Sequence, residues 1–344
     1  MTAPAFQLLH NPNHGVPGLV TLPEGGFRRA RAAIAAWPNY CLAEARALPE
    51  LARAAGVAAL HHLPAAPLRE VGTAFAATRA LLSALARGGV AAQADAAALE
   101  SGALRHLTGQ VTLACRVGPA EPWDGFSEAL AVARAARRFG AGCAALVSPA
   151  TPEPLREDLL AEGAALHETG GTAASAHALA EAQGWQLISD LAVPGFTEPP
   201  RDVMQGYRVA VAGALAPLSE EPTHLLVAAG SGALATAAAA ALRANPGTPV
   251  PPLILLEPAG AAPFLALAAG QGGDTEGATS LLAWGELGRS VNAFLVLRAG
   301  ACGGLDAASL PDDLAALLAA RPAADALRQA LGIDGASRLL VIGG

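Results

Sequence analysis

The sequence is organised around one stretch, Thr223-His-Leu-Leu-Val-Ala-Ala-Gly-Ser-Gly-Ala-Leu-Ala-Thr236, in which an apolar run, a glycine-punctuated turn and an alanine-rich segment follow one another. The pattern predicts a buried strand over 225–228, a tight loop over 230–233 and a helix that continues to about Asn245. Backbone N–H groups at such a helix N-terminus favour a phosphate or a carboxylate. A plain strand-to-helix connection is the alternative, because a short Gly-x-Gly pattern is weakly specific.

Strand and helix patterns alternate regularly between about residues 125 and 190. Short connections between alternating strands and helices imply parallel strands joined by right-handed crossovers, so the expected fold class is α/β. The helices expected along the chain cover 28–36, 43–55, 73–86, 92–107, 126–139, 152–162, 172–183, 199–215, 261–269, 307–320 and 323–331. The further expected strands cover 57–63, 110–115, 143–148, 165–168, 185–189, 252–257, 293–298 and 338–343, and an irregular arm is expected over 1–26.

Composition and charge exclude several classes of partner. The formal net charge is −7 and no long basic cluster occurs, so nucleic acid is not an expected partner. No apolar stretch reaches about eighteen residues without a charge or a helix breaker, which argues against a membrane span. The N-terminus lacks the pattern of a signal peptide, and a cytoplasmic protein is expected.

The cysteines and one histidine pair give no indication of a metal site. The cysteines are scattered without a C-x-x-C pair, which argues against both a metal site and a disulfide framework. The adjacent pair His61-His62 is expected on a strand, where neighbouring side chains face opposite sides and cannot share one ion. The cysteines are Cys41, Cys115, Cys143 and Cys302.

The chain contains no lysine. All 22 residues in the Lys+Arg count are arginines. Arginine stays protonated and cannot act as an amine nucleophile, so no lysine side chain can form an imine with an aldehyde cofactor.

Several motifs occur in a characteristic order. They are Trp185-Gln-Leu-Ile-Ser-Asp-Leu-Ala-Val-Pro-Gly-Phe-Thr197, Val203-Met-Gln-Gly-Tyr207, Pro222-Thr-His-Leu-Leu-Val-Ala-Ala-Gly-Ser-Gly-Ala233, Leu255-Leu-Glu-Pro258 and Gly272-Gly-Asp274. In this order they resemble the diaminopropionate ammonia-lyases, which belong to the fold-type II pyridoxal phosphate family together with the tryptophan synthase β-subunit and threonine dehydratase.

The resemblance implies a two-domain α/β fold that holds pyridoxal phosphate in the cleft. Residues 1–75 and 170–344 would form the larger domain, and 76–169 the smaller. Asp190 matches an acid/base group of the family, although it could instead be a solvated carboxylate at the end of a strand. The family also suggests a homodimer. The residues that would hold the cofactor phosphate are Gly230, Ser231, Gly232 and Ala233.

The same comparison shows three departures from the family pattern. The family carries its cofactor on the lysine of a Phe-Lys pair, whereas this chain has Phe75-Ala76, so Ala76 occupies the lysine position. The family's Gly-Asn-His-Gly loop is replaced by the sequence of 116–123, with Arg116 in place of a second catalytic aspartate. The hydroxyl that pairs with the pyridine nitrogen would fall where the chain stops at Gly344.

Three hypotheses about function remain open at this point. The first is a catalytically inert relative of the ammonia-lyases that keeps a cleft for a small amino-acid-like or phosphate-bearing ligand. The second is an active enzyme that holds the cofactor non-covalently and uses Asp190, His61 or His62 as its base. The third is a non-catalytic regulatory or assembly subunit that pairs with an intact paralogue.

Overall fold

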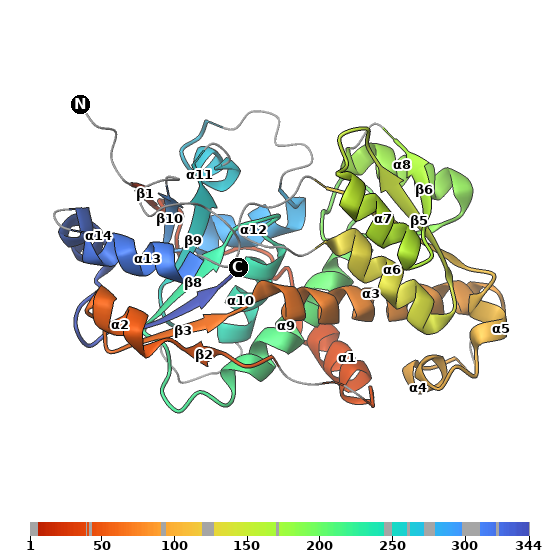
Figure 1. Cartoon of the computed structure of the whole chain (residues 1–344), viewed down its shortest axis with the longest axis horizontal. Coiled ribbons are helices and arrows are strands. Elements are labelled where there is room, and N and C mark those ends of the chain that lie inside the picture. Colours follow the sequence, from red (N-terminus) through yellow and green to blue (C-terminus); the bar gives the residue numbers. More distant parts are fainter. Residues whose placement is uncertain are drawn as a thin grey trace.

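The computed structural model places two β-sheets beside each other, each with its own helices (Figure 1). The residues that it describes are 6–38, 40, 43–90, 94–118, 127–169, 172–243, 250–259, 262–271, 279–297, 310–320 and 323–343. In these ranges the strands are β1 (Phe6–His10), β2 (Arg46–Ala47), β3 (Ala59–Leu63), β4 (Thr112–Arg116), β5 (Gly142–Val147), β6 (Ala165–Glu168), β7 (Gln186–Ile188), β8 (His224–Ala228), β9 (Leu253–Pro258), β10 (Ala293–Leu297) and β11 (Arg338–Ile342). The helices are α1 (Glu24–Ala35), α2 (Pro49–Ala55), α3 (Ala65–Arg87), α4 (Ala96–Glu100), α5 (Arg105–Thr108), α6 (Glu128–Phe139), α7 (Glu153–Ala161), α8 (Ala173–Gln183), α9 (Glu198–Leu215), α10 (Ala233–Leu242), α11 (Pro263–Ala268), α12 (Leu281–Ser290), α13 (Leu310–Ala319) and α14 (Ala323–Leu331).

Both sheets are mostly parallel. The larger sheet has the order β1-β10-β9-β8-β11-β3-β2, in which the edge strands β1 and β2 pair antiparallel with their neighbours and the other pairs are parallel. The smaller sheet has the order β6-β5-β4-β7, and all of its pairs are parallel. Parallel strands connected through helices confirm the expected α/β fold.

The larger sheet is buried on both faces, and the side chains of β8 show how. Leu225 and Val227 face a core that includes residues of α9, α10 and α12. Leu226 and Ala228 face the opposite core, which α2, α13 and α14 cover. Because successive side chains of a strand point to opposite faces, a strand between two cores is expected to be apolar on both faces, as residues 225–228 of β8 are.

Helices α3 and α9 cross between the two sheets at a pair of glycines. Figure 1 shows α3 running from the larger sheet to the smaller one. A Cβ atom on Gly206 of α9 would lie only 2.6 Å from the Cα atom of Gly72 on α3. The two backbones therefore approach each other so closely that neither position has room for a side chain.

The structure corrects several expectations about individual elements. The segment 1–26, predicted to be an irregular arm, contributes β1 as an antiparallel edge strand on β10. The helix predicted over 92–107 is replaced by the short helices α4 and α5, and α12 occupies a stretch for which no element is predicted. Helix α3 begins at Ala65 rather than at residue 73, because Thr73 lies within a longer continuous helix.

The smaller sheet extends beyond residue 169, where the sequence places a domain boundary. Strand β7 pairs in parallel with β4, and α8 packs against both strands. The division into 1–75 with 170–344 and 76–169 stays a prediction, and β7 belongs to the smaller sheet whichever boundary is chosen.

Candidate functional site

The loop of residues 230–233 joins β8 to α10 as the sequence predicts. Gly230 and Gly232 have φ values of +47° and +84°, in the left-handed region that favours glycine. The Gly232 N–H donates to the carbonyl of Ala229 at 2.7 Å. The Ala233 N–H donates to Ser231 Oγ at 3.3 Å. Two backbone donors of the loop are thus bonded locally, one to the residue that precedes the loop and one to its serine.

The loop is pressed against α11 and α12. A Cβ atom on Gly232 would lie 2.4 Å from Phe264 Cζ and 2.8 Å from Ala283 Cβ. The carbonyl of Ser231 accepts the N–H of Ser280, which precedes α12, at 3.0 Å. These contacts hold the loop against the helices α11 and α12.

The structure brings Asp190 to this loop. Asp190 follows β7 of the smaller sheet, and its Oδ2 atom accepts the Ser231 hydroxyl at 2.7 Å. Both side chains are buried, with 8% and 6% of their surface exposed. The carboxylate is thus a partner of the loop's serine and not a solvated group at a strand end. Its role in catalysis stays a prediction.

Glu128, the first residue of α6, was missed by the sequence analysis. Its Oε1 atom accepts the backbone N–H of Asp190 at 2.7 Å, and its Oε2 atom accepts the Ser189 hydroxyl at 3.3 Å. The only sequence signal is Ser127, which caps the helix through the Leu130 N–H, followed by an acidic residue. That signal is ordinary for a helix start and does not indicate a site.

Burial raises the pKa of the Glu128 carboxyl well above its usual value, and the charge of Asp190 raises it further. The Asp190 N–H, Arg116 and Arg69 oppose this shift. Arg69 on α3 and Arg116 at the end of β4 are both buried and have partners of their own. The site therefore contains two carboxylates and two guanidinium groups away from bulk water.

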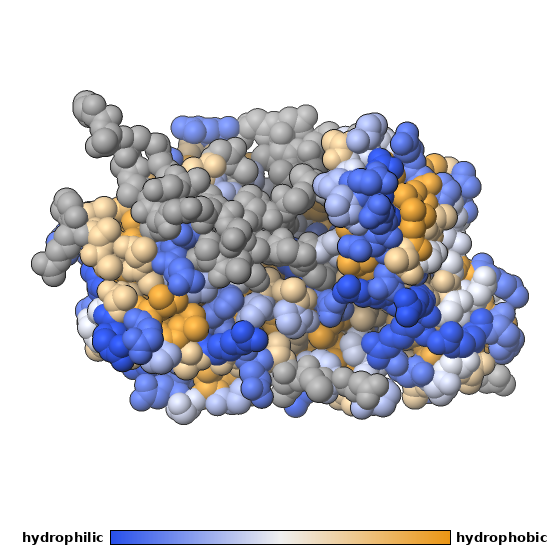
Figure 2. All heavy atoms as spheres, viewed as in Figure 1, coloured by the Kyte–Doolittle hydropathy of each residue, from blue (hydrophilic) through white to orange (hydrophobic). Residues whose placement is uncertain are grey.

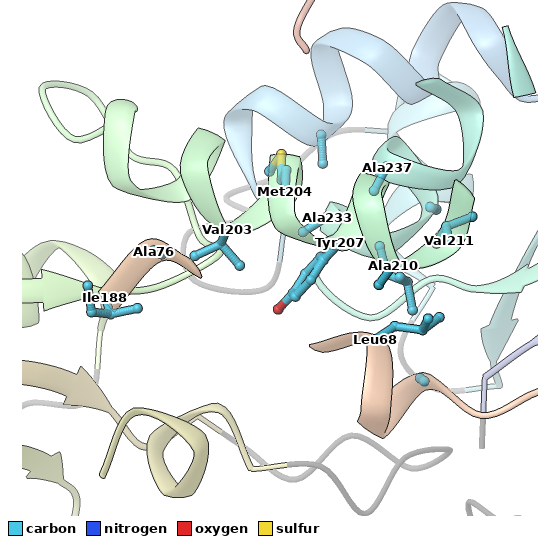
Figure 3. Close-up of a cluster of buried hydrophobic side chains, with 14 of the residues drawn as sticks. Leu68, Ala76, Ile188, Val203, Met204, Tyr207, Ala210, Val211, Ala233 and Ala237 are labelled. Carbon is cyan, nitrogen blue, oxygen red and sulfur yellow. The ribbon is translucent and has the colours of Figure 1, made fainter. Parts of the chain in front are cut away.

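Tyr207 of α9 extends toward α3 between Ala76 and Leu68 (Figure 3). Its ring lies over Gly72, where a Cβ atom would come within 2.1 Å of Cδ1. Burial raises the pKa of the Tyr207 hydroxyl well above its usual value, and the charges of Asp190 and Glu128 raise it further. Thr73 faces this hydroxyl and lowers the pKa slightly, without the geometry of a full hydrogen bond.

Ala76 lies in the apolar core and not at the opening of a helix. It is 2% exposed and sits in the middle of α3. Figure 3 shows it near Ile188 of β7 and Val203 of α9. No amine is present at the position where the family resemblance places one.

The other candidate positions lie apart or outside the described residues. The His62 ring is hydrogen-bonded to the carbonyl of Gly343 at the end of β11. His61 and His62 follow each other on β3, as expected. The structure describes Arg116 to Gly118 of the 116–123 loop, but 119–123, the glycine motif 272–274 and Gly344 lie outside the described residues.

The described part of the chain holds neither a candidate metal site nor a candidate membrane span. No group of three or more His, Cys, Asp or Glu side chains there could hold a metal ion. Of the helices that the structure describes, none is both long and apolar enough to span a membrane. Cys115 and Cys143 are buried free thiols, whereas Cys41 and Cys302 lie outside the described residues.

Glu257 at the end of β9 is a further buried carboxylate. Its two oxygens accept the N–H groups of Phe264 and Leu265, both at 2.8 Å. These are the first N–H groups of α11, so the carboxylate joins β9 to the helix that packs on Gly232. Burial raises the pKa of Glu257 from 4.5 to about 7, against the effect of the two N–H groups.

The raised pKa predicts a pH-dependent contribution to stability. Because the folded protein holds this proton more tightly than the unfolded chain, the contribution is full below pH 4.5 and is lost as the pH rises through about 7. A shift of this size corresponds to about 3 kcal/mol. Replacing Glu257 by glutamine removes the titration. The free energy of unfolding of Glu257→Gln, relative to wild type, is therefore expected to rise between pH 5 and pH 8.

Urea unfolding of both proteins at the two pH values measures this difference. Glu221, which is exposed, provides the matched control, and Glu221→Gln is expected to differ from wild type equally at both pH values. A constant difference between Glu257→Gln and wild type would contradict the predicted titration.

The sequence of the chain is similar to a family of known proteins. The sequence pattern of the family described as "Pyridoxal-phosphate dependent enzyme" matches residues 127–311, which is more than half of the 344 residues. The diaminopropionate ammonia-lyase of Salmonella typhimurium is 34% identical over 87 residues, which cover 24% of this chain and 22% of that protein. The sequence match to this relative thus spans less than a quarter of its length.

Solved structures match over nearly the whole chain. Holo diaminopropionate ammonia lyase from Escherichia coli has a TM-score of 0.82 at 19% identity, with 99% of this chain and 93% of that chain covered. Maize serine racemase has a TM-score of 0.65 at 16% identity, with coverage of 94% and 92%. Threonine deaminase isoform 2 from Solanum lycopersicum has a TM-score of 0.64 at 14% identity, with coverage of 100% and 88%. At these identities the likeness concerns the fold.

Proposed function

The chain belongs to the pyridoxal-phosphate dependent enzyme family, and from this premise we propose that it is a degenerate relative of the diaminopropionate ammonia-lyases without imine-based lyase activity. One observation carries the proposal. None of the 344 residues is a lysine, and Ala76, where the resemblance places the family's lysine, is a buried residue of an apolar core.

The chemistry of the cofactor explains why this substitution matters. Pyridoxal phosphate acts as an electron sink for an amino acid that is joined to its aldehyde carbon, and enzymes that use it hold that carbon on a lysine amine. The residues around Ala76 do not fit such an attachment, because Ile188 and Val203 are apolar and the cluster beyond them carries no amine. No step through the cofactor is therefore assigned to this chain.

The buried polar groups near the 230–233 loop keep the character of a ligand site for a small polar molecule. Asp190, Glu128 and Arg69 act electrostatically on the Tyr207 hydroxyl, and Arg116 acts on Glu128. Such a set could recognise a small amino-acid-like or phosphate-bearing ligand. We further propose that the protein acts in the cytoplasm as a homodimer.

Two alternatives remain. An active ammonia-lyase could hold pyridoxal phosphate non-covalently and use Asp190, which lies buried beside Ser231, as its acid/base group. A regulatory or assembly subunit could pair with an intact paralogue. Co-purification with a lysine-bearing homologue would support this second alternative over a protein that binds its ligand without a partner subunit.

The proposal predicts that the chain cannot be trapped on the cofactor. Protein with an acetylated N-terminus is incubated with pyridoxal phosphate and borohydride, and its intact mass is measured. No mass increase is expected, because the side chains contain no primary amine. The diaminopropionate ammonia-lyase of Escherichia coli serves as the positive control.

Activity is measured in parallel as ammonia release from diaminopropionate with added pyridoxal phosphate. No release above the protein-free rate is expected. Ammonia release by the wild type that disappears in the Asp190→Asn variant would contradict the proposal and favour an enzyme that holds the cofactor non-covalently.

A further inference from the structure

The Gly230–Ala233 loop already has an anion among its partners. Its only hydroxyl group, that of Ser231, donates to Asp190 Oδ2 at 2.7 Å in a buried environment. The Ser231 Oγ atom in turn accepts the Ala233 N–H. A hydrogen bond to a carboxylate is shorter and stronger than one between neutral groups. The carboxylate is thus joined to the first residue of α10 through the serine.

Asp190 is held in this place from both directions along the chain. The Glu128 carboxyl accepts the Asp190 N–H at 2.7 Å and also accepts the hydroxyl of the preceding Ser189. The Ser189 hydroxyl oxygen in turn accepts the Leu191 N–H at 3.2 Å. After it, the Ala192 N–H donates to Ser280 Oγ at 3.1 Å. A segment tied at both ends cannot withdraw its carboxylate from the loop without breaking several buried hydrogen bonds.

A phosphate group in the loop would have to lie next to this carboxylate. Like charges a few ångströms apart repel strongly when water is excluded. Gly232 is also packed closely against Phe264 of α11 and Ala283 of α12, which restricts movement of the loop toward these helices. The Ser231 hydroxyl is therefore already used by Asp190, and a phosphate bound to this loop would lie beside a second negative charge.

We propose that Asp190 is the specificity-determining residue of this loop: its carboxylate takes the position of a bound anion, so that the cleft rejects phosphate-bearing compounds. This inference rests on the proposed function, because it chooses between the two ligand classes named there. The ligand of the cleft is then a small amino-acid-like molecule without a phosphate group.

Calorimetric titration of the full chain at pH 8 tests the inference. The probes are pyridoxine 5′-phosphate and pyridoxine, which carry no aldehyde and differ only in the phosphate. Wild type is expected to bind the two probes equally weakly. The Asp190→Asn variant is expected to bind pyridoxine 5′-phosphate roughly tenfold to a hundredfold more tightly than wild type does, with pyridoxine unchanged.

Two variants separate the effect of Asp190 from other causes. Glu128→Gln removes the neighbouring carboxylate, which does not contact the loop, and is expected to change phosphate affinity much less than Asp190→Asn does. Ser231→Ala removes the hydroxyl but keeps the Asp190 charge, and no gain in phosphate affinity is expected. An equal gain in Glu128→Gln would overturn the assignment to Asp190.

The wild-type measurement alone can also overturn the inference. If wild type binds pyridoxine 5′-phosphate at least about tenfold more tightly than pyridoxine, the loop accepts phosphate with Asp190 in place. That result does not depend on whether the variants fold. It would leave the proposed function intact, because loss of imine chemistry is tested separately by borohydride trapping and ammonia release.

Discussion

Replacing Gly72 by alanine is expected to lower the free energy of unfolding by about 3 kcal/mol or more, the largest single effect predicted for this chain. The new Cβ atom would lie 2.1 Å from Tyr207 Cδ1 and 2.6 Å from the backbone oxygen of Val203. The oxygen belongs to the main chain of α9 and cannot rotate away. Helices α3 and α9 would have to separate, and the buried polar groups between them would lose their arrangement.

Gly285 provides the matched control for this prediction. It also lies inside a helix, α12, and a Cβ atom there would meet nothing within 4 Å. Gly285→Ala is expected to leave stability unchanged or raise it by up to about 1 kcal/mol, since alanine has the higher helix propensity. Urea unfolding followed by circular dichroism measures both variants. If Gly72→Ala and Gly285→Ala had equal stabilities, the close contact between α3 and α9 would be wrong.

Replacing Gly232 by alanine is expected to cost about 2–4 kcal/mol for two separate reasons. The residue has a φ of +84°, which costs alanine about 1–2 kcal/mol. Its Cβ atom would also lie 2.4 Å from Phe264 Cζ and 2.8 Å from Ala283 Cβ, so overpacking adds to the backbone strain.

Gly184 separates the two causes. It follows α8 with a φ of +70°, and a Cβ atom there would meet nothing within 4 Å. Gly184→Ala is expected to cost only the backbone part, about 1–2 kcal/mol. Shortening the obstructing side chain through Phe264→Leu should make the combined loss smaller than the sum of the two single losses. Strict additivity in thermal and urea unfolding would contradict the contact.

These two glycines show what positions the candidate site. Gly72 allows the Tyr207 ring to lie on α3, which puts its hydroxyl within electrostatic reach of Asp190 and Glu128. Gly232 allows the loop to sit against α11, which Glu257 attaches to β9. The site is therefore built on aromatic side chains, Tyr207 and Phe264, that pack directly onto glycine residues.

The amino-acid sequence alone determined the local secondary structure and the absence of a lysine amine. The strand, loop and helix of the segment around Gly230 to Ala233 follow from an apolar run, left-handed glycines and an alanine-rich continuation, all of which are properties of neighbouring residues. The α/β fold follows in the same way from alternating strand and helix patterns. The absence of lysine is a matter of composition, and no fold can supply the missing amine.

Only the tertiary structure decided which polar groups meet. Asp190 and Ser231 are 41 residues apart and Asp190 and Glu128 are 62 apart, yet they form one buried cluster between two sheets. The edge strand β1 likewise needed its partner β10, 283 positions or more along the chain. Periodicity reports which face of an element is buried but not what it is buried against, because partner choice depends on long-range packing and on where buried polar groups can find hydrogen bonds.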